Sequence, residues 1–208
     1  MNMLQFIDYK YIPKVIFEAG CADGTHTKIL AEFFKKSMIY AFEPVDEYYN
    51  IAIEKTKHLK NVKIFNLALG EKNEKKTLYI SRNEDGSLWC SNSLLKPKEH
   101  LQYCPHIKFE NETRIVDVVS LDSFCNDNNI ENIDFFWMDM QGYEMKTLLS
   151  ATKMINKINS IWTEINLVES YEGVELYDTY KNWLISKGFR LIQEEINDYH
   201  QGDALFIK

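Results

Sequence analysis

The chain has 208 residues, which suffices for one α/β domain with a full hydrophobic core and is short for two. Hydrophobic residues make up 45% of it and charged residues 26%, as is ordinary for a soluble globular protein. The formal net charge of −7 argues against a protein that binds nucleic acid regardless of sequence, because such proteins need a basic face. No apolar run approaches the roughly 20 residues of a membrane span. From the charge and from this lack of a long apolar run, we expect neither nucleic acid nor a membrane among the partners.

The start of the chain and its cysteines indicate a compartment. Residues 1–13 lack the basic and apolar regions of a signal peptide. Four cysteines are scattered without the spacing of metal ligands, which favours reduced thiols over a zinc site or a disulfide framework. They are Cys21, Cys90, Cys104 and Cys125. We therefore predict a cytoplasmic protein with one domain over residues 1–208 and no bound metal, while the oligomeric state stays open.

Strand-like and helix-like segments alternate along the first part of the chain. Short apolar runs predict the strands, and apolar residues at helical spacing predict the helices, with Asp46 as a helix cap. The strands are expected at 15–18, 38–42 and 62–66, the helices at 25–36 and 46–57, and a further extended segment at 77–80. This alternation is typical of a parallel sheet that is covered by helices.

Residues 81–113 change character, because polar residues, glycine and proline are common there and periodicity is weak. A loop of this length in a compact domain is usually functional or disordered. We interpret it as an insertion on the substrate side. Its aromatic and polar side chains suit a sugar or a similarly hydroxylated ligand, and they are Trp89, Asn92, Ser93, His100, Tyr103 and His106.

The alternation resumes after the insertion and ends in two adjacent strands. Strands are expected at 115–119, 133–138, 160–163, 189–193 and 204–207, and helices at 121–125, 144–150 and 176–187. Ser120 is expected to cap the first of these helices, and Gly188 to end the last one. The final two strands, joined by a polar loop over 194–203, suit an antiparallel pair at a sheet edge.

Acidic residues follow four of the expected strands. They are Glu18, Glu43, Asp139 and Glu164. Ligands of open α/β sheets bind outside the carboxyl ends of the strands, so these side chains are expected to gather at one site. Each alone is compatible with a helix cap or a solvated charge, whereas four equivalent positions favour a function.

Gly20 and Gly24 bracket the first strand-to-helix turn, where glycine permits positive φ and a close approach of a ligand. The pattern differs from the GxGxxG fingerprint that presents a helix N-terminus to a pyrophosphate. Glu18 and Asp23 flank the glycines and would repel a pyrophosphate. They suit a cofactor with an amino group and a sulfonium cation, so the turn favours S-adenosylmethionine over NAD.

Two further positions are expected to contact the adenosine part of such a cofactor. Glu43 stands about 20 residues after the glycine turn, where nucleotide-binding folds place a carboxylate that accepts hydrogen bonds from two ribose hydroxyls. Asn66 and the following Ala68 and Leu69 end the third strand and are expected near the adenine, with Asn66 offering a donor and an acceptor.

Three blocks of the sequence form a distinctive set. The first is FEAGCADGTHT at 17–27. The second is AFEPVDEYYNIAIE at 41–54 with NLALGE at 66–71. The third is VVSLDSF at 118–124 with IDFFWMDMQGYEMKTLLSA at 133–151. Together they resemble the FkbM family of class I S-adenosylmethionine-dependent methyltransferases. The first block alone is weak, but the order and spacing of all three are fairly specific, and the match covers roughly residues 14–207.

The resemblance implies a Rossmann-like fold, with a mostly parallel seven-stranded sheet, a reversed final strand and helices on both faces. It also implies cofactor contacts from Glu18, Gly20, Gly24, Glu43, Asn66, Asp139 and Gln141, and more weakly from Thr27 and Ser93. To these we add three residues of the same turns and strand ends, namely Cys21, Asp23 and Ala68. Cys21 and Asp23 depart from the common residues of the family. Gln141 stands where the family usually has glutamate, which removes one negative charge.

Methyl transfer to an alcohol requires alignment with the methyl carbon and removal of the hydroxyl proton. Glu164, at a strand end next to Asp139, is the preferred general base, followed by His200 in the last loop and by His26. Alternatively, Glu164, Asn166 and Asp139 hold a divalent cation.

We therefore predict an O-methyltransferase that uses S-adenosylmethionine and a small-molecule or glycan acceptor, namely a sugar or a secondary metabolite. The alternatives are a catalytically silent adenosine-binding partner module and an NAD-dependent oxidoreductase.

Overall fold

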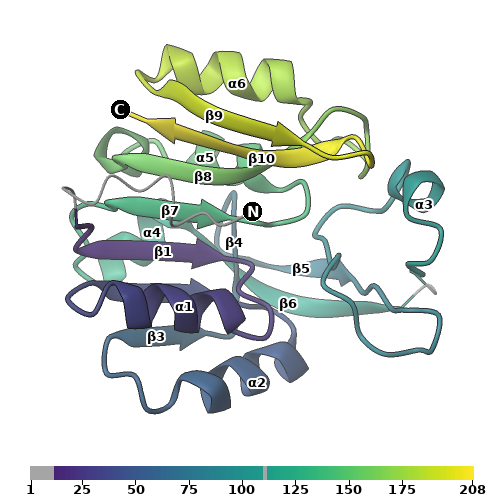
Figure 1. Cartoon of the computed structure of the whole chain (residues 1–208), viewed down its shortest axis with the longest axis horizontal. Helices are drawn as coiled ribbons and strands as arrows, with labels where there is room; N and C mark the ends of the chain where they lie inside the picture. Colours follow the sequence, from purple (N-terminus) through teal and green to yellow (C-terminus); the bar gives the residue numbers. More distant parts are fainter. Residues whose placement is uncertain (1–11, 110–111) are drawn as a thin grey trace.

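A computed structural model of the protein describes residues 12–109 and 112–208. Its main sheet has seven strands in the order β3-β2-β1-β7-β8-β10-β9 (Figure 1). The strands are β1 (Val15–Ala19), β2 (Met38–Phe42), β3 (Val62–Phe65), β7 (Phe135–Met138), β8 (Ser160–Asn166), β9 (Arg190–Ile196) and β10 (Gln201–Ile207). The last strand, β10, runs antiparallel to both of its neighbours, while the pairs from β3 to β8 are parallel. The prediction of a mostly parallel sheet with a reversed final strand is confirmed.

Helices cover both faces of this sheet because the strands are apolar on both sides. The helices are α1 (Thr25–Phe33), α2 (Asp46–Thr56), α4 (Leu121–Asp127), α5 (Glu144–Ser150) and α6 (Tyr177–Ser186), with the 3₁₀ helix η2 (Met154–Lys157). Ile16 of β1 packs with Leu30 of α1, whereas its neighbour Phe17 packs on the opposite face with Phe124 and Leu148 of α4 and α5. Successive side chains of a strand point to opposite faces, so both layers of the core follow from one apolar run.

The order of the strands reverses between β1 and β7. The chain builds β1, β2 and β3 outward in one direction, and later places β7 on the other side of β1. The loops that leave β1 and β7 therefore diverge and open a crevice at the carboxyl edge of the sheet. The candidate site lies in this crevice.

A second, three-stranded sheet extends from the carboxyl edge and was not predicted. It has the order β4-β6-β5, from β4 (Ala68–Gly70), β5 (Glu74–Tyr79) and β6 (Thr113–Ser120). The insertion between β5 and β6 includes the short helix α3 (His100–Tyr103) and lies beyond these strands (Figure 1). Isolated bridges fix it, including Tyr79 with Ser93 and Pro97 with Tyr171. Its described residues thus form an ordered structure rather than the disordered loop that the composition allowed.

Two predictions about helix ends were wrong for local reasons. Helix α1 ends at Phe33 instead of residue 36, because Phe34 leaves helical geometry to enter the core beside Ile39. Asp46 does not cap α2; Val45 is the N-cap residue, and Asp46 accepts a hydrogen bond from Asn66 Nδ2 at 2.7 Å. By contrast, the Ser120 side chain accepts from Ser123 N at the start of α4, as predicted.

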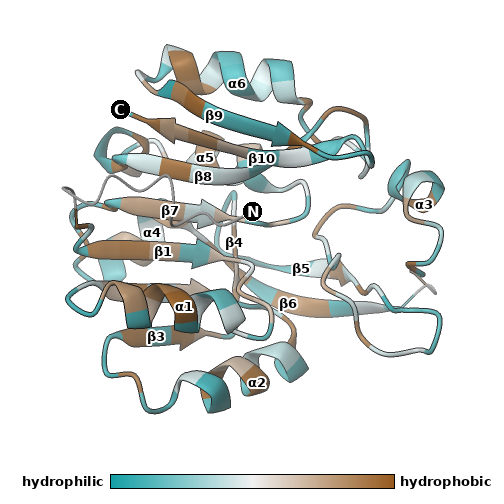
Figure 2. Cartoon of the chain, in the orientation of Figure 1, coloured by the Kyte–Doolittle hydropathy of each residue, from teal (hydrophilic) through white to brown (hydrophobic). Residues whose placement is uncertain are grey.

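Strands β8, β9 and β10 are all longer than expected, and the longer β8 changes the position of Glu164. Strands β8 and β10 pair from Ser160 with Ile207 to Asn166 with Gln201, so Glu164 lies inside β8 rather than at its end. The expected loop at 194–203 shrinks to residues 197–200. Figure 2 shows that β9 is hydrophilic along most of its length, which suits the edge of a sheet. In the part of the chain that the structure describes, no helix is long and apolar enough to cross a membrane.

Candidate functional site

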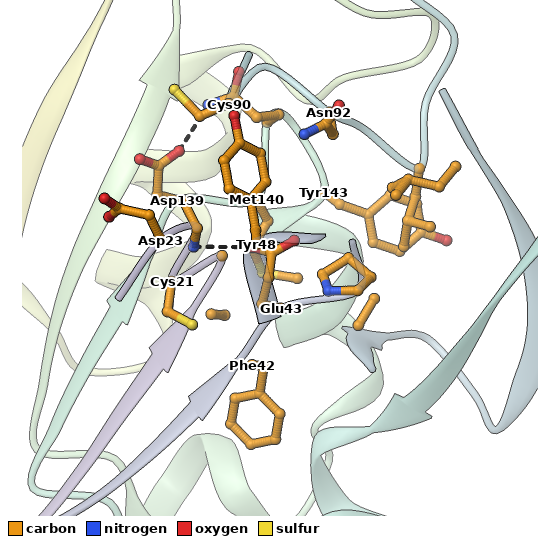
Figure 3. Close-up of a pocket in the computed structure, with 18 of the residues that line it drawn as sticks. Cys21, Asp23, Phe42, Glu43, Tyr48, Cys90, Asn92, Asp139, Met140 and Tyr143 are labelled. Atoms are coloured by element: carbon orange, nitrogen blue, oxygen red, sulfur yellow. Dashed lines mark hydrogen bonds between the residues drawn. The ribbon is translucent and has the colours of Figure 1, made fainter. Parts of the chain in front are cut away.

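A cavity of about 430 Å³ opens at the carboxyl edge of the main sheet. Its size lies in the range of small-molecule sites, roughly 300–1,000 Å³. The loops after β1, β2 and β7 form one side, and Leu88, Trp89, Cys90, Asn92 and Leu94 of the insertion form another. Figure 3 shows Asp23, Glu43 and Asp139 around the same space. Among the described lining residues there is no lysine or arginine, so the cavity favours a cationic ligand over a pyrophosphate.

The structure brings seven of the predicted cofactor residues to this cavity. They are Gly20, Cys21, Asp23, Glu43, Ala68, Asp139 and Gln141. Five others, Glu18, Gly24, Thr27, Asn66 and Ser93, do not line it. Neither do the two residues expected to be catalytic, Glu164 and His200, although His26 does.

The two glycines of the first turn are required by packing as well as by backbone conformation. Gly20 has φ +84°, and a Cβ there would lie 1.9 Å from the Asp139 carbonyl oxygen. Gly24 has φ +73°, and its Cβ would lie 2.8 Å from the Ala52 Cβ of α2. The turn thus holds β1 against the loop after β7, and α1 against α2. Between the glycines, Ala22 adopts φ +44°, a conformation that few non-glycine residues adopt.

Glu43 follows β2 and faces the cavity from a buried position. Its Oε1 accepts a hydrogen bond from Val45 N at 2.8 Å, and its Oε2 accepts one from Ala22 N at 2.9 Å. Burial raises the pKa of Glu43 to about 7, and the two backbone N–H groups counter this in part. Each oxygen keeps a further lone pair, so the carboxyl group suits a diol.

Glu18 was predicted to meet the cofactor, but its side chain is directed at α1. It is 2% exposed, and its Oε2 accepts a hydrogen bond from Thr27 Oγ1 at 2.6 Å. Burial raises its pKa to about 8. Glu18 and Thr27 form a buried layer beneath the glycine turn, and they support the turn rather than line the cavity.

Asp23 carries negative charge at the cavity. Burial would raise its pKa, but hydrogen bonds from Lys55 and Thr25 outweigh burial and lower that pKa. The Lys55 ammonium also contacts Thr25 Oγ1 at 2.6 Å, so α2 is tied to the first residue of α1. Asp23 therefore stays ionised beside the glycine turn.

A chain of polar groups follows β7 and leads away from the cavity. Gln141 Nε2 donates to Asp139 Oδ1 at 2.7 Å and to Glu164 Oε1 at 3.3 Å. Glu164 Oε2 is buried and has no hydrogen-bond partner among the residues that the structure describes. Burial, together with the Asp139 and Glu144 carboxyl groups, raises the pKa of Glu164 well above its usual range. Glu164 thus lies behind Gln141 rather than in the cavity wall.

The two histidines proposed as bases lie in different places. His26 lines the cavity, and its ring stacks on Trp137 at 4.6 Å between centroids. Burial lowers its pKa, against the opposing effect of Asp23. His200 lies on the turn before β10, where its ring meets Tyr103 of α3 edge to face at 4.6 Å.

Sequence reasoning missed several cavity residues that carry no charge at a strand end. Tyr48 of α2, Met140 and Tyr143 line the wall between the glycine turn and the second sheet. From the insertion, Cys90 was also missed, whereas Trp89 and Asn92, which were expected on the acceptor side, do line the cavity; the Asn92 amide forms hydrogen bonds with Ser81 and Trp89. Tyr48 had one signal, since it follows the Phe-Glu-Pro segment by four residues and so lies on the first turn of α2.

The described residues hold no group of three or more histidine, cysteine, aspartate or glutamate side chains that is arranged for a metal ion. In the alternative cation site of Glu164, Asn166 and Asp139, the Asn166 Oδ1 atom already accepts a hydrogen bond from Gln201 Nε2 at 3.1 Å.

Comparisons with known proteins identify relatives of the chain and of its fold. Residues 19–191 match the family model described as the methyltransferase FkbM domain. The chain is 29% identical over 161 residues to a Sinorhizobium fredii protein named 2-O-methyltransferase NoeI, a match that covers 76% of this chain and 66% of that protein. The chain therefore spans slightly less than two thirds of this relative's length.

Two solved structures share the fold at low sequence identity. Aeropyrum pernix fibrillarin with natively bound S-adenosyl-L-methionine has a TM-score of 0.53 and 9% identity, over 94% of this chain and 66% of that chain. The N-methyltransferase NodS of Bradyrhizobium japonicum with S-adenosyl-L-homocysteine has a TM-score of 0.53 and 11% identity, over 96% and 80%. The comparisons give no support to the silent binding module or to the oxidoreductase.

Proposed function

The chain belongs to the FkbM family of methyltransferases, and we propose that it transfers the methyl group of S-adenosylmethionine to a hydroxyl group of a carbohydrate or a similarly hydroxylated small molecule. Its fold is that of class I S-adenosylmethionine-dependent methyltransferases. The observation that carries the proposal is an acidic cavity, free of lysine and arginine among its described residues, with the buried Glu43 carboxyl group at its wall.

The residues of the cavity divide between the two ends of the proposed donor. Glu43 would accept hydrogen bonds from the ribose hydroxyls, and Tyr48 and Leu69 offer apolar surface to the adenine. The charged methionine end would lie between Asp23 and Asp139, beside the glycine turn. When bound, the donor supplies an electrophilic methyl group on a sulfonium.

Among the candidate bases, His26 is the one that lines the cavity, and we assign it the acceptor proton. Its lowered pKa keeps the imidazole neutral near neutral pH, so a lone pair is free to take a proton. The nearby Asp23 carboxylate favours the imidazolium that results. Glu164 is not assigned this role, because it lies behind Gln141 and its raised pKa favours the protonated carboxyl group, which cannot accept a proton.

The insertion supplies the acceptor side of the proposal. Trp89 is 39% exposed and lines the cavity, so its indole offers a flat surface for the apolar face of a sugar ring. The name of the relative NoeI, a 2-O-methyltransferase, supports a hydroxyl acceptor.

The same proposal includes the cellular compartment of the enzyme and the class of its partners. All four cysteines are free, as in a reducing compartment, so we place the enzyme in the cytoplasm. The net charge of −7 leaves nucleic acid out of the proposed partners.

Two measurements test the proposal. Calorimetric titration should show binding of S-adenosylhomocysteine by the intact protein and weaker binding by Glu43→Ala, and no binding by the intact protein would overturn the assignment of the donor. Incubation with S-adenosylmethionine and a panel of oligosaccharides should then release S-adenosylhomocysteine, with mass spectrometry locating the added methyl group on oxygen. Donor binding without turnover of any acceptor would favour the silent module.

A further inference from the structure

Gln141 connects the loop after β7 with three other segments of the chain. Its backbone has φ +53°, and its carbonyl oxygen accepts a hydrogen bond from Ser93 Oγ of the insertion at 2.7 Å. Its Nε2 faces Asp139 and Glu164, at 2.7 and 3.3 Å. Its Oε1 accepts a hydrogen bond from the Tyr171 hydroxyl group at 2.7 Å.

The direction of the Gln141 amide follows from its partners. The Asp139 carboxylate accepts hydrogen bonds and donates none, so the amide nitrogen faces Asp139, and Glu164 Oε1 is a second, weaker acceptor for it at 3.3 Å. The amide oxygen must then face a donor, and the Tyr171 hydroxyl group is that donor. A reversed amide would place an oxygen against Asp139 and an NH₂ group against the Tyr171 hydroxyl group, which would then donate to its longer acceptor alone, Ser91 O at 3.3 Å. Tyr171 therefore stabilises the orientation in which Gln141 supports Asp139.

Tyr171 is itself held rigidly, although it does not line the cavity. The side chain is 0% exposed, and its residue pairs with Pro97 of the insertion. On either side, Lys98 N donates to Ser170 O at 2.9 Å and Glu172 N donates to Lys96 O at 2.8 Å. The loop after β8 and the insertion thus form one short ladder that fixes the tyrosine.

The support matters because Asp139 lies in strongly acidic surroundings. Burial raises its pKa, and the hydrogen bond from Gln141 is the interaction that favours its charged form. Neighbouring carboxyl groups also interact with it electrostatically, namely Glu18, Glu43, Glu144, Glu164 and Asp203. Without the amide N–H, the cavity would lose negative charge at this position.

We propose that Tyr171 is a positioning residue for recognition of the donor's positive charge: it directs the Gln141 amide nitrogen at Asp139, which thereby presents a carboxylate to the sulfonium end of the cavity. This inference rests on the proposed function. It assigns a role to a residue that does not line the cavity, and it makes donor recognition depend on docking of the insertion.

The test compares two probes that differ in charge at sulfur. S-adenosylmethionine carries a sulfonium cation, whereas S-adenosylhomocysteine has a neutral thioether and otherwise the same recognition groups. In Tyr171→Phe, calorimetry should show an affinity for S-adenosylmethionine about tenfold lower and an affinity for S-adenosylhomocysteine changed less than about threefold. The ratio of the two dissociation constants is the readout, since a general structural defect would weaken both ligands alike.

Tyr180→Phe is the matched control. Tyr180 is also buried, at 3% exposure, and its hydroxyl group is 3.1 Å from Thr163 Oγ1, outside this network. It should leave both affinities within about twofold. Should Tyr171→Phe fail to fold, Gln141→Met removes the same hydrogen bonds at similar side-chain size and should produce the same selective loss.

If Tyr171→Phe weakens the affinity for both ligands equally, or changes the affinity for neither, the proposed role of Tyr171 is overturned. If the intact protein binds neither ligand, the proposed function fails first and this inference fails with it.

Discussion

At the scale of single residues, Glu43 should make donor binding depend on pH. Its pKa is about 7 in the free protein, and two ribose hydroxyls that donate to it would favour the ionised form and lower that pKa. Binding would then release a proton, so the affinity for S-adenosylhomocysteine should rise with pH up to about 7, by at most about tenfold per unit, and then level off. Calorimetric titration between about pH 5.5 and 8 measures this slope.

Glu43→Gln is the control for this prediction, because other buried carboxyl groups also titrate in the range. Glu18, with a pKa of about 8, would contribute the same slope to both proteins. The difference between the intact protein and the variant therefore isolates Glu43. Identical slopes would contradict its assignment as the ribose ligand.

Sequence reasoning located the cavity at this scale but not the direction of every side chain. Glu43 and Asp139 were predicted because the carboxyl ends of parallel strands meet at one edge. Glu18 has an equivalent position in the sequence, yet its side chain is satisfied by Thr27 beneath the turn. Asn66 donates to Asp46 instead of facing the cavity. Strand position predicts which residues approach a site, whereas tertiary partners decide which of them face it.

At the scale of elements, the contact of α1 with α2 depends on Gly24. Gly24→Ala would place a Cβ 2.8 Å from the Ala52 Cβ, at a residue with φ +73°. We expect a loss of about 3 kcal/mol in the free energy of unfolding, from the contact and the backbone conformation together. Gly86→Ala is the matched control, because Gly86 has φ +81° and no atom of the described residues lies within 4 Å of a Cβ there. It should lose about 1 kcal/mol from the backbone conformation, and equal losses for the two variants in urea denaturation would show that the contact with Ala52 costs nothing.

The docking of the insertion should weaken in acid because of His100 in α3. This residue is 3% exposed, its ring packs against Tyr171 and Phe109, and its Nδ1 has no hydrogen-bond partner within residues 12–109 and 112–208. Burial lowers its pKa to about 4, below the ordinary 6.5. The folded state therefore binds fewer protons than the unfolded state between these values, and stability should fall as pH drops from about 6.5 towards 4, by about 3 kcal/mol at most.

Hydrogen exchange measures this effect where it acts. At about pH 5, and after correction for intrinsic rates, amides of residues 81–109 should lose protection relative to about pH 7 in the intact protein. His100→Phe, which keeps an aromatic ring and removes the titration, should lose less. The same pH dependence in both proteins would show that another group destabilises the insertion.

At the scale of the whole molecule, the main sheet could be predicted because each of its strands has a strong local signal. Apolar runs from β1 to β8 alternate with helical patterns, and the final pair follows from two strands with a short connection. The second sheet could not be predicted, since β4 has three residues and pairs with β6 across the insertion. Order within residues 81–109 depends on long-range pairs such as Pro97 with Tyr171, which no local pattern encodes.

Ligand binding at the crevice should stabilise the whole molecule, since the cavity is built from loops of several strands and disappears on unfolding. At about 100 times the dissociation constant, S-adenosylhomocysteine should add about 2.7 kcal/mol, which for a chain of this size raises the melting temperature by about 5–10 °C. Differential scanning calorimetry measures the shift. Glu43→Gln at the same ligand concentration should shift less, because the ligand binds it more weakly. NAD should leave the melting temperature unchanged, as its pyrophosphate would face Asp23 and Asp139; an equal shift with NAD would contradict a cavity selective for a cationic donor.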